Sequence, residues 1–398
     1  MHFKQGTDMT QQAFSIEETI IEEMTAEELN QIVSTGARIK VIGVGGGGGN
    51  MINHMAKSNT AGIDLIVANT DAQVLEKSLA DVKLQLGVKL TKGLGAGMKP
   101  EVGRESALES YEDIKSVLGG ADIVFVATGL GGGTGTGAAP IVAQAAREIG
   151  ALTIAVVTKP FKMEGRKRSK LADNGLSELK KESDSIVVIP NEKLLSLVDK
   201  NLGIKDSFKM VDEVLSRAVS GTSGIILSSG EDDINVDFAD LQTVMSHRGL
   251  ALMGVGEAQG DRSAFDAVKK AVDSPLLDNV TIDGAMGVLV HFYINPAYPL
   301  TAINEAMEIA YESADEDADV IFGTTTDDDM DINSVRITIV ATGFERELQS
   351  STTNNQTYDT KDANSNDLKQ RRPILKIVGG DVSEDYLDIP TYMRNQKD

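Results

Sequence analysis

The sequence predicts an α/β fold: a doubly wound, Rossmann-like first unit, a long central helix, a second α/β unit and a disordered C-terminal tail. In the first unit, short apolar runs alternate with helical patterns near 49–59, 101–118 and 134–148. The apolar runs lie at 39–44, 64–69, 122–127, 152–157 and 185–189. Strands and helices that alternate in this way form a parallel sheet with helices on both faces.

The pattern changes after the first unit. A helical pattern at 205–228 is followed by candidate strands at 251–256, 286–294, 318–323 and 335–342. The resulting divisions are an acidic extension (1–37), a first α/β unit (38–204), a helix and loop (205–234), a second α/β unit (235–344), a polar linker (345–384) and a terminal segment (385–398). The linker has too few apolar residues to fold alone. The terminal segment, where apolar residues return, is typical of a partner-binding peptide, although it could also fold back onto the core.

Two glycine loops carry the strongest functional signal. The first glycine loop (43–49) and the second glycine loop (129–137) each follow a predicted strand and lead into a predicted helix. Glycine lets backbone N–H groups approach an anion closely, and a helix N-terminus favours negative charge. Because ligands of such sheets bind at the carboxyl ends of the strands, we expect the two loops to hold a nucleotide's phosphates from two sides.

The phosphate loops lack the lysine of the GxxxxGK[ST] pattern. Backbone N–H groups, helix dipoles and the hydroxyls of Thr134 and Thr136 would therefore hold the phosphates, and Mg²⁺ would offset their charge. A third loop (91–104) is equally compatible with closure over the outer phosphate and with a plain surface turn.

A pair of acids stands about a hundred residues after the second glycine loop. Asn235 is the expected N-cap of a helix, and Asp237 and Asp240 then share one helix face. Acids in a first helical turn usually only complement the helix dipole. They could also polarise a water for attack on a phosphate. In that case either the two units fold over one site, or the acids serve a site on another molecule.

Composition narrows the classes of protein. The net charge is −22 with a pI near 4.6, which disfavours binding to nucleic acid or to anionic membranes. The chain has no cysteine, no stretch long enough to span a membrane and no signal peptide, so we expect a cytoplasmic protein. The nine acids of 312–331 are interpreted as a solvated face, in preference to a metal site.

A dinucleotide-dependent oxidoreductase is the alternative from another class. Gly43, Gly45 and Gly48 match the G-x-G-x-x-G spacing, and Asp71 follows at a suitable distance. The run of five glycines at 45–49, the second glycine loop and the scattered histidines all count against this reading.

Eight segments together resemble the tubulin/FtsZ GTPase family, and specifically its bacterial cell-division members. They are IKVIGVGGGGGN (39–50), NTDAQ (69–73), GLGAGMKPEVGR (93–104), GLGGGTGTGAAP (129–140), VVTKPFKMEGRKR (156–168), IPNEKLL (189–195), NVDFADLQTVM (235–245) and VRITIVATGF (335–344). The terminal LDIPTYMR (387–394) is similar to the family's partner-binding peptide. The resemblance implies a tubulin-like GTPase.

The resemblance also implies the nucleotide-binding residues. They are Gly46, Gly47, Gly48, Gly49, Asn50, Ala96, Gly97, Gly133, Thr134, Gly135, Glu164, Arg168, Asn191, Phe208 and Asp212. Glu164 and Arg168 would lie on the ribose side, while Asn191, Phe208 and Asp212 would form the base pocket. A carboxylate at Asp212 can accept from both N1–H and the exocyclic amine of guanine, a pairing that adenine does not offer.

Head-to-tail filaments are a further implication of the resemblance. Asn235, Asp237 and Asp240 would then act on the GTP of the next subunit, with Mg²⁺ on its phosphates. The filaments would form the division ring at mid-cell, and 385–398 would bind membrane-tethering division proteins without entering the membrane itself. A scaffold that binds GTP without hydrolysing it is the remaining alternative, which the intact 235–240 segment disfavours. Three features depart from the family pattern: the long extension 1–37, the short linker with nearly balanced charge, and the acidic approach 228–238. The acids at 231–233 in that approach put the strength of the subunit interface in doubt.

Overall fold

The computed structural model describes residues 37–58, 62–194, 203–227, 234, 237–246, 249–277 and 285–344. Almost all of the predicted extension, the linker and the terminal peptide lie outside the described residues, as do Asn235 and the acids at 231–233. The predictions made for these segments therefore stay predictions.

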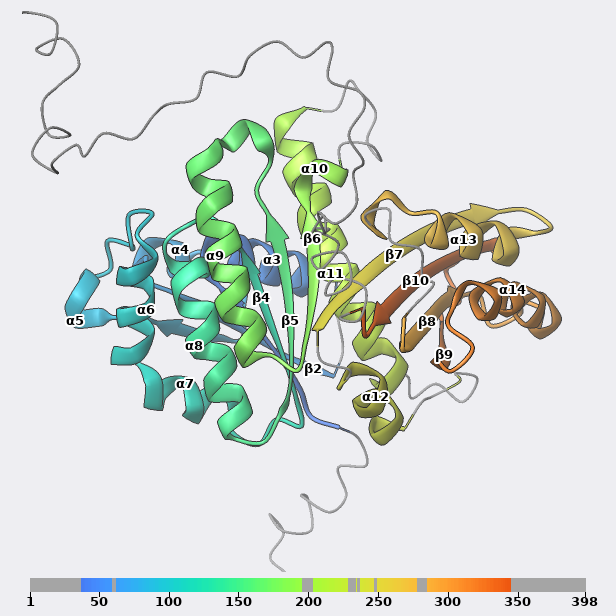
Figure 1. Cartoon of the computed structure of the whole chain (residues 1–398), viewed down its shortest axis with the longest axis horizontal. Helices are drawn as coiled ribbons and strands as arrows, with labels where there is room; N and C mark the ends of the chain where they lie inside the picture. The colour runs from blue at the N-terminus through green and yellow to red at the C-terminus, as the bar shows by residue number, and fades with distance from the viewer. Residues whose placement is uncertain are drawn as a thin grey trace, which may run out of the picture. The chain divides into compact units, whose positions relative to one another are not determined.

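One sheet of ten strands organises the described residues, in the order β3-β2-β1-β4-β5-β6-β7-β10-β8-β9 (Figure 1). The strands are β1 (Ile39–Val44), β2 (Ile63–Asn69), β3 (Val82–Gln85), β4 (Ile123–Gly129), β5 (Leu152–Lys159), β6 (Ser185–Pro190), β7 (Gly249–Gln259), β8 (Gly287–Ile294), β9 (Asp319–Thr326) and β10 (Ser334–Thr342). The first six strands pair in parallel, whereas β10 is antiparallel to both β7 and β8.

Strand β7 joins the two halves of the sheet. Its first residues pair with β6 in parallel, and the following residues from Leu252 onward pair with β10. The sheet therefore continues from one half to the other, and the division into two units at 204 and 235 stays a prediction.

Helices cover both faces of the first half of the sheet. They are α3 (Gly45–Lys57), α4 (Ala72–Glu76), α5 (Val88–Thr91), α6 (Pro100–Glu109), α7 (Tyr111–Leu118), α8 (Thr134–Glu148), α9 (Arg166–Glu182), α10 (Asn191–Leu194) and α11 (Ile204–Leu227), with a 3₁₀ turn η1 (Lys162–Glu164). The second half adds α12 (Phe238–Met245), the 3₁₀ turn η2 (Pro275–Leu277), α13 (Ser263–Val272) and α14 (Leu300–Ser313).

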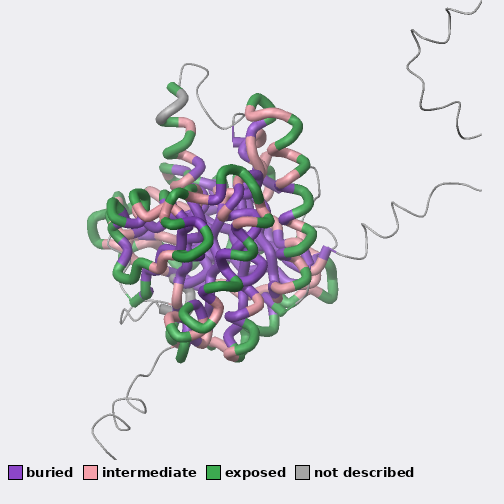
Figure 2. The backbone as a smooth tube through the Cα atoms, turned by 90° about the vertical axis from the view of Figure 1, so that its left-hand side faces the viewer, coloured by how far each residue is buried: buried purple, intermediate pink, exposed green. Residues whose placement is uncertain are grey.

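The alternation of side chains along the strands builds two separate cores. In β1, Val41 points to the face covered by α3, α11 and α12, while Ile42 points to the face covered by α6, α7, α8 and α9. A third core lies between α13, α14 and the strands β8 and β10. Buried backbone therefore gathers in the sheet, and the exposed positions lie on the outer sides of the helices (Figure 2).

The sequence prediction of the fold class is confirmed, and every predicted strand is present. Several details differ. The short edge strand β3 and the helices α4, α5, α9, α10, α13 and α14 were not predicted. The single helix expected at 101–118 is two helices with a break at Ser110. Helix α3 begins at Gly45 instead of residue 49, so the glycines form its first turn. Among the described residues, no helix is both long and apolar enough to cross a membrane.

Core packing of α11 gives a direct test of this arrangement. Leu215 is 1% exposed between α11 and the sheet, so Leu215→Ala should lower the free energy of unfolding by about 2–5 kcal/mol. Urea unfolding of the full chain measures this loss. The matched control is Leu79→Ala at a side chain that is 52% exposed, where we expect a change below about 0.5 kcal/mol. Equal losses in the two variants would contradict the assignment of α11 to the core.

Candidate functional site

The two glycine loops pack directly against each other at the carboxyl ends of β1 and β4. A Cβ added to Gly45, whose φ is +72°, would lie 2.7 Å from the amide nitrogen of Gly135. A Cβ on Gly47 would lie 2.9 Å from the amide nitrogen of Gly129. Real Cβ atoms do not approach so closely, so glycine is required for the loops to meet. This contact brings the N-termini of α3 and α8 side by side.

Other glycines of the same loops face open space. A Cβ on Gly46, Gly97 or Gly132 would meet no atom within 4 Å. Neither α3 nor α8 carries an acidic residue in its first turn. The unpaired N–H groups of two helix N-termini therefore lie beside an open space without nearby carboxylates on those turns, which suits a polyphosphate.

Buried hydroxyl groups hold the phosphate loops in shape. Thr134 at the start of α8 shares a hydrogen bond of 2.7 Å with Thr70, which is fully buried. The hydroxyl of Thr136, which was expected to contact phosphate, is also buried and accepts a hydrogen bond of 2.8 Å from the Gly131 N–H. It therefore shapes the second glycine loop from inside. Thr70 lies in the family-like segment 69–73, but no local pattern predicts its contact with Thr134.

The third loop is tied to the other two. Gly95 N–H donates to the Thr70 carbonyl at 3.2 Å, and Asp71 forms a β-bridge with Leu94. Ala96 is buried beside Gly133, where an added Cβ would lie 2.9 Å from the Ala96 methyl group. Gly97 and Met98 both have positive φ angles, +56° and +58°. The loop is thus a third wall of the open space, which favours the closure reading over a plain surface turn.

Asp71 itself caps α4. Its carboxylate accepts hydrogen bonds from the N–H groups of Gln73 and Val74 at 3.0 and 3.3 Å. The acid that the oxidoreductase reading assigns to a ribose is therefore used in capping a helix.

The predicted ribose-side residues lie next to the second glycine loop. Glu164 and Arg168 form an ion pair, and the Glu164 carboxylate also accepts from the Phe161 N–H at 2.9 Å. The Arg168 carbonyl would lie 3.0 Å from a Cβ on Gly131, so the start of α9 borders that loop. The Arg168 Nε is buried and has no hydrogen-bond partner within the described part of the chain.

The predicted base pocket contains one unpaired buried acceptor and one desolvated carboxyl group. Phe208 of α11 contacts Phe161 edge to face, with ring centroids 5.5 Å apart. Asn191, the first residue of α10, is buried, and its Oδ1 has no hydrogen-bond partner among the described residues. One helical turn after Phe208, burial raises the pKa of Asp212 from 3.8 to about 6. A buried acceptor without a donor and a desolvated carboxyl suit a base that presents several N–H groups, and guanine is such a base.

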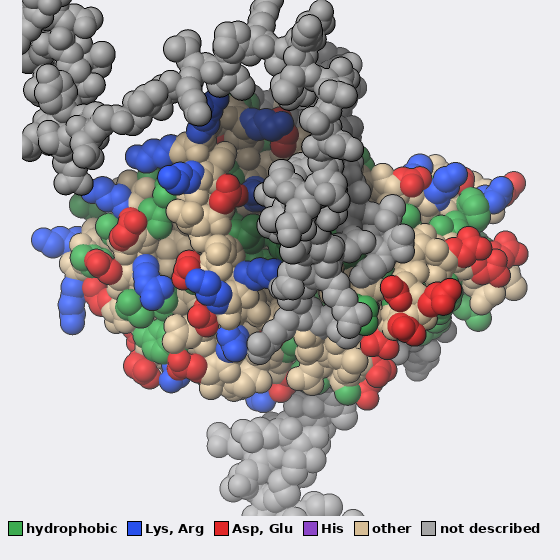
Figure 3. Space-filling view, viewed as in Figure 1, with side chains coloured by type: hydrophobic (Ala, Val, Ile, Leu, Met, Phe, Trp, Pro, Cys, Tyr) green, Lys and Arg blue, Asp and Glu red, His purple; other side chains and the backbone are tan. Residues whose placement is uncertain are grey.

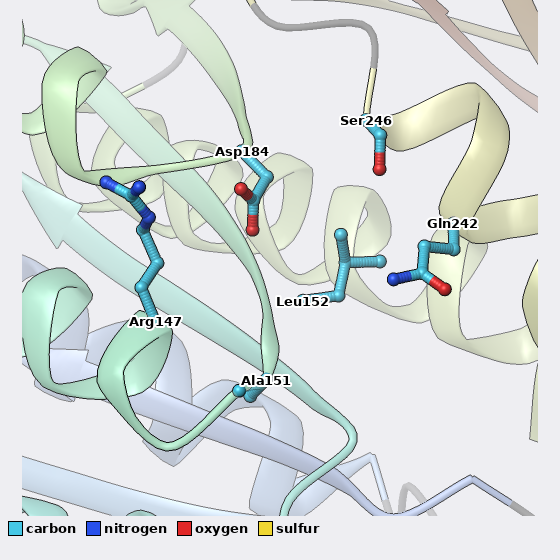
Figure 4. A pocket seen from close by; sticks show the side chains of 7 residues that line it. Arg147, Ala151, Leu152, Asp184, Gln242 and Ser246 are labelled. Carbon is cyan, nitrogen blue, oxygen red and sulfur yellow. The ribbon is translucent and has the colours of Figure 1, made fainter.

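Asp237 and Asp240 belong to the start of α12, and this helix borders the ends of the parallel strands opposite to the glycine loops. Gln242 and Ser246, on α12 and at its C-cap, line a polar cavity of about 220 Å³ together with Arg147, Gly150, Ala151, Leu152 and Asp184 (Figure 4). Leu152 begins β5 and Asp184 precedes β6, so α12 borders the amino ends of these strands. In Figure 1, α12 lies below the sheet and α10, which follows β6, lies above it. The eight residues of β5 span roughly 26 Å.

The structure corrects the expected start of α12. Asp237, not Asn235, is the N-cap, because its carboxylate accepts from the Ala239 N–H at 3.3 Å and its backbone is extended. Asp240 lies in the first turn of the helix, and both acids are exposed. Two exposed carboxylates on one helix end are free to contact a group outside the chain.

The acidic run at 312–331 is mostly exposed and gathers at the α14–β9 end of the described unit (Figure 3). Within the described ranges, no group of three or more His, Cys, Asp or Glu residues could hold a metal ion. The exposure of most of these acids agrees with the predicted solvated face.

The fold and the three-loop site define a tubulin-like GTPase. Residues 38–199 match the GTPase domain of the tubulin/FtsZ family, and residues 249–345 match the C-terminal domain of the FtsZ family. A cell division protein FtsZ from Helicobacter pylori is 46% identical, with 95% of this chain and 97% of the relative covered. The corresponding protein from Pseudomonas aeruginosa is 45% identical, with 93% and 100% covered. The chain belongs to the FtsZ family.

Solved structures agree with this assignment. An empty FtsZ dimer from M. jannaschii superimposes with a TM-score of 0.76 at 45% identity, covering 81% of this chain and 94% of that one. CetZ2 from Haloferax volcanii, at 20% identity and a TM-score of 0.66, shares the fold. The chain is therefore a GTPase that binds GTP and GDP, and the oxidoreductase alternative has no support.

The open side of Gly46 gives a test of the phosphate site. A methyl group fits at this position without a clash, so Gly46→Ala should leave the thermal midpoint unchanged. The methyl group would occupy space beside the α3 N-terminus, and we expect GTP affinity to fall about tenfold or more. Differential scanning fluorimetry and a fluorescent GTP analogue measure the two quantities. Unchanged affinity in the folded variant would remove Gly46 from the site.

The raised pKa of Asp212 predicts a pH dependence of GTP affinity. Above about pH 6 the carboxyl is ionised and can accept from guanine, whereas protonation below that value removes this ability. Affinity of the dilute monomer should therefore fall about tenfold from pH 7 to pH 5. The phosphates of GTP also titrate over this range, and Asp212→Asn experiences the same titration. The GTP affinity of this variant should be weaker than that of the parent and should change less between pH 7 and pH 5. Parallel profiles for the two proteins would contradict the prediction.

Proposed function

We propose that GTP is hydrolysed between two copies of this chain. One copy holds the nucleotide on its glycine loops, and the other supplies Asp237 and Asp240 from α12. The observation that carries this proposal is that the glycine loops follow the carboxyl ends of β1 and β4, whereas α12, which carries the acids, borders the amino ends of β5 and β6. A neighbour stacked head to tail would bring the acids of one copy to the glycine loops of the next.

The phosphates would be held by the N–H groups of Gly46 and Gly47 and of Gly133 to Gly135, with Asn50, Ala96, Gly97 and Thr134 around them. Gly48 and Gly49, which are buried, would contribute by letting α3 pack closely behind the site. Glu164 and Arg168 would contact the ribose, and Asn191, Phe208 and Asp212 the guanine. The buried, unpaired Asn191 Oδ1 and the desolvated Asp212 carboxyl support the base pocket.

The acids of the neighbouring copy would act on water. An exposed carboxylate beside the outer phosphate can orient an attacking water and accept its proton. Asp240 is best placed for this role because Asp237 already accepts the Ala239 N–H as the helix cap. Asn235, which lies outside the described residues, belongs to the same proposed set. Mg²⁺, when bound to the phosphates, would neutralise part of their charge.

Stacking of this kind makes filaments. A contact between two different faces of the same molecule repeats without closing. The FtsZ relative from M. jannaschii was solved as a dimer, which supports self-association of the family fold. We propose that the filaments of this chain form the ring at mid-cell during division and that hydrolysis weakens their contacts. Residues 345–384 would then act as the tether and 385–398 as the peptide that binds a membrane-tethering partner.

Turnover should depend on assembly. Phosphate release per subunit should be negligible in dilute protein and rise above a threshold concentration, because a single subunit holds only half of the site. Asp240→Ala should bind GTP and sediment as polymer like the parent, yet hydrolyse about 100-fold more slowly or worse. Constant specific activity on dilution, or normal turnover by Asp240→Ala, would overturn the proposal. A scaffold that never hydrolyses GTP would release no phosphate at any concentration.

A further inference from the structure

Thr324, a buried residue of β9, forms two hydrogen bonds with Ile234, which precedes the acids Asp237 and Asp240 in the chain. Ile234 N–H donates to the Thr324 hydroxyl at 2.8 Å, and Thr324 N–H donates to the Ile234 carbonyl at 3.1 Å. Thr324 is 2% exposed. Bonds shielded in this way are not readily replaced by water, so the loss of one partner leaves a polar group unsatisfied.

Ile234 occupies the free edge of the sheet. Strand β9 stands last in the strand order and pairs in parallel with β8 on its inner side. The reciprocal pair with Ile234 therefore lies on the outer side of β9. Ile234 is three residues before Asp237, the N-cap of α12.

The far end of α12 has its own attachment. The Thr342 hydroxyl of β10 donates to the Val244 carbonyl at 2.8 Å and is fully buried. Helix α12 also packs against β8 and β9. The helix is therefore tied to the same sheet at both ends, and the Thr324–Ile234 pair is the attachment nearer to the acids.

We propose that Thr324 is a positioning residue for GTP hydrolysis, because its hydroxyl and N–H hold Ile234, three residues before Asp237. Thr324 does not touch the nucleotide. The inference rests on the proposed function, in which these acids serve the neighbouring copy.

The hydroxyl has a separate role from the backbone. The N–H of Thr324 alone makes one bond to Ile234. The second bond, from the Ile234 N–H to the side chain, closes a ring of atoms and holds the peptide groups of Ile234 against β9 at two points. Catalysis depends on such placement, since displacement of a reacting group by about 1 Å can cost up to about 100-fold in rate.

Thr324→Val tests the hydroxyl at nearly constant volume. We expect phosphate release at saturating GTP, well above the assembly threshold, to fall about tenfold or more. We expect two quantities to stay within about twofold of the parent: the GTP dissociation constant of the monomer and the amount of sedimented polymer. The reason is that Thr324 lies in β9, whereas the glycine loops follow β1 and β4. Thr324→Ser, which keeps the hydroxyl, should restore most of the turnover.

Thr222→Val is the matched control for a lost buried hydroxyl. Thr222 is 1% exposed, and its hydroxyl donates to the Ala218 carbonyl inside α11. This variant should lose a similar amount of thermal stability without the same fall in turnover per polymerised subunit. An equal fall in both variants, parent-like turnover by Thr324→Val, or no rescue by Thr324→Ser would each overturn the inference.

A double variant separates the inference from the proposed function. If Thr324 acts through the acids, Thr324→Val should add no further loss in the Asp240→Ala background. An additive loss would show that Thr324 acts by another route. Normal turnover by Asp240→Ala itself would instead remove the proposed function, while a dead Asp240→Ala beside an active Thr324→Val would remove the inference alone.

Discussion

The contact between Gly45 and Gly135 is the constraint on which the site depends. With an amide nitrogen 2.7 Å from where a Cβ would stand, no other residue at position 45 lets the two loops meet. Their meeting sets the N-termini of α3 and α8 side by side, and it leaves Gly46, Gly97 and Gly132 facing open space. The N-termini of two helices thus supply positive electrostatic potential at the phosphate site, where other nucleotide-binding proteins use a lysine side chain.

The parallel sheet supplies the second constraint. The loops that follow β1, β4, β5 and β6 all lie at the carboxyl ends of these parallel strands, and α12 borders the amino ends. Helices α11 and α12 both pack against the sheet, and Leu215 of α11 and Leu241 of α12 belong to the same buried core. The proposed function would therefore assign nucleotide binding and hydrolysis to opposite ends of the parallel strands.

Much of this arrangement could be read from the sequence. Apolar runs predict the strands because a parallel sheet is buried on both faces, and the glycine runs mark the loops. The pKa of Asp212 could not be predicted, because it follows from the burial of the carboxyl group in the folded chain. Position 235 was expected as the cap because asparagine is a good N-cap, but the carboxylate of Asp237 takes that role. The bonds from Thr70 to Thr134 and from Thr324 to Ile234 join residues 64 and 90 positions apart, and local patterns carry no signal for such contacts.

Under the proposed function, the opposite placement of the two half-sites would have a consequence for the ends of a filament. In a stack of such subunits every internal contact would complete one site, so the number of complete sites would be one fewer than the number of subunits. At one end, the last subunit would present glycine loops that no acid pair reaches, and its GTP would persist. At the other end, an acid pair would face solvent with no nucleotide to act on. A chemical difference between the two ends would therefore arise from geometry alone, without any additional protein to mark them.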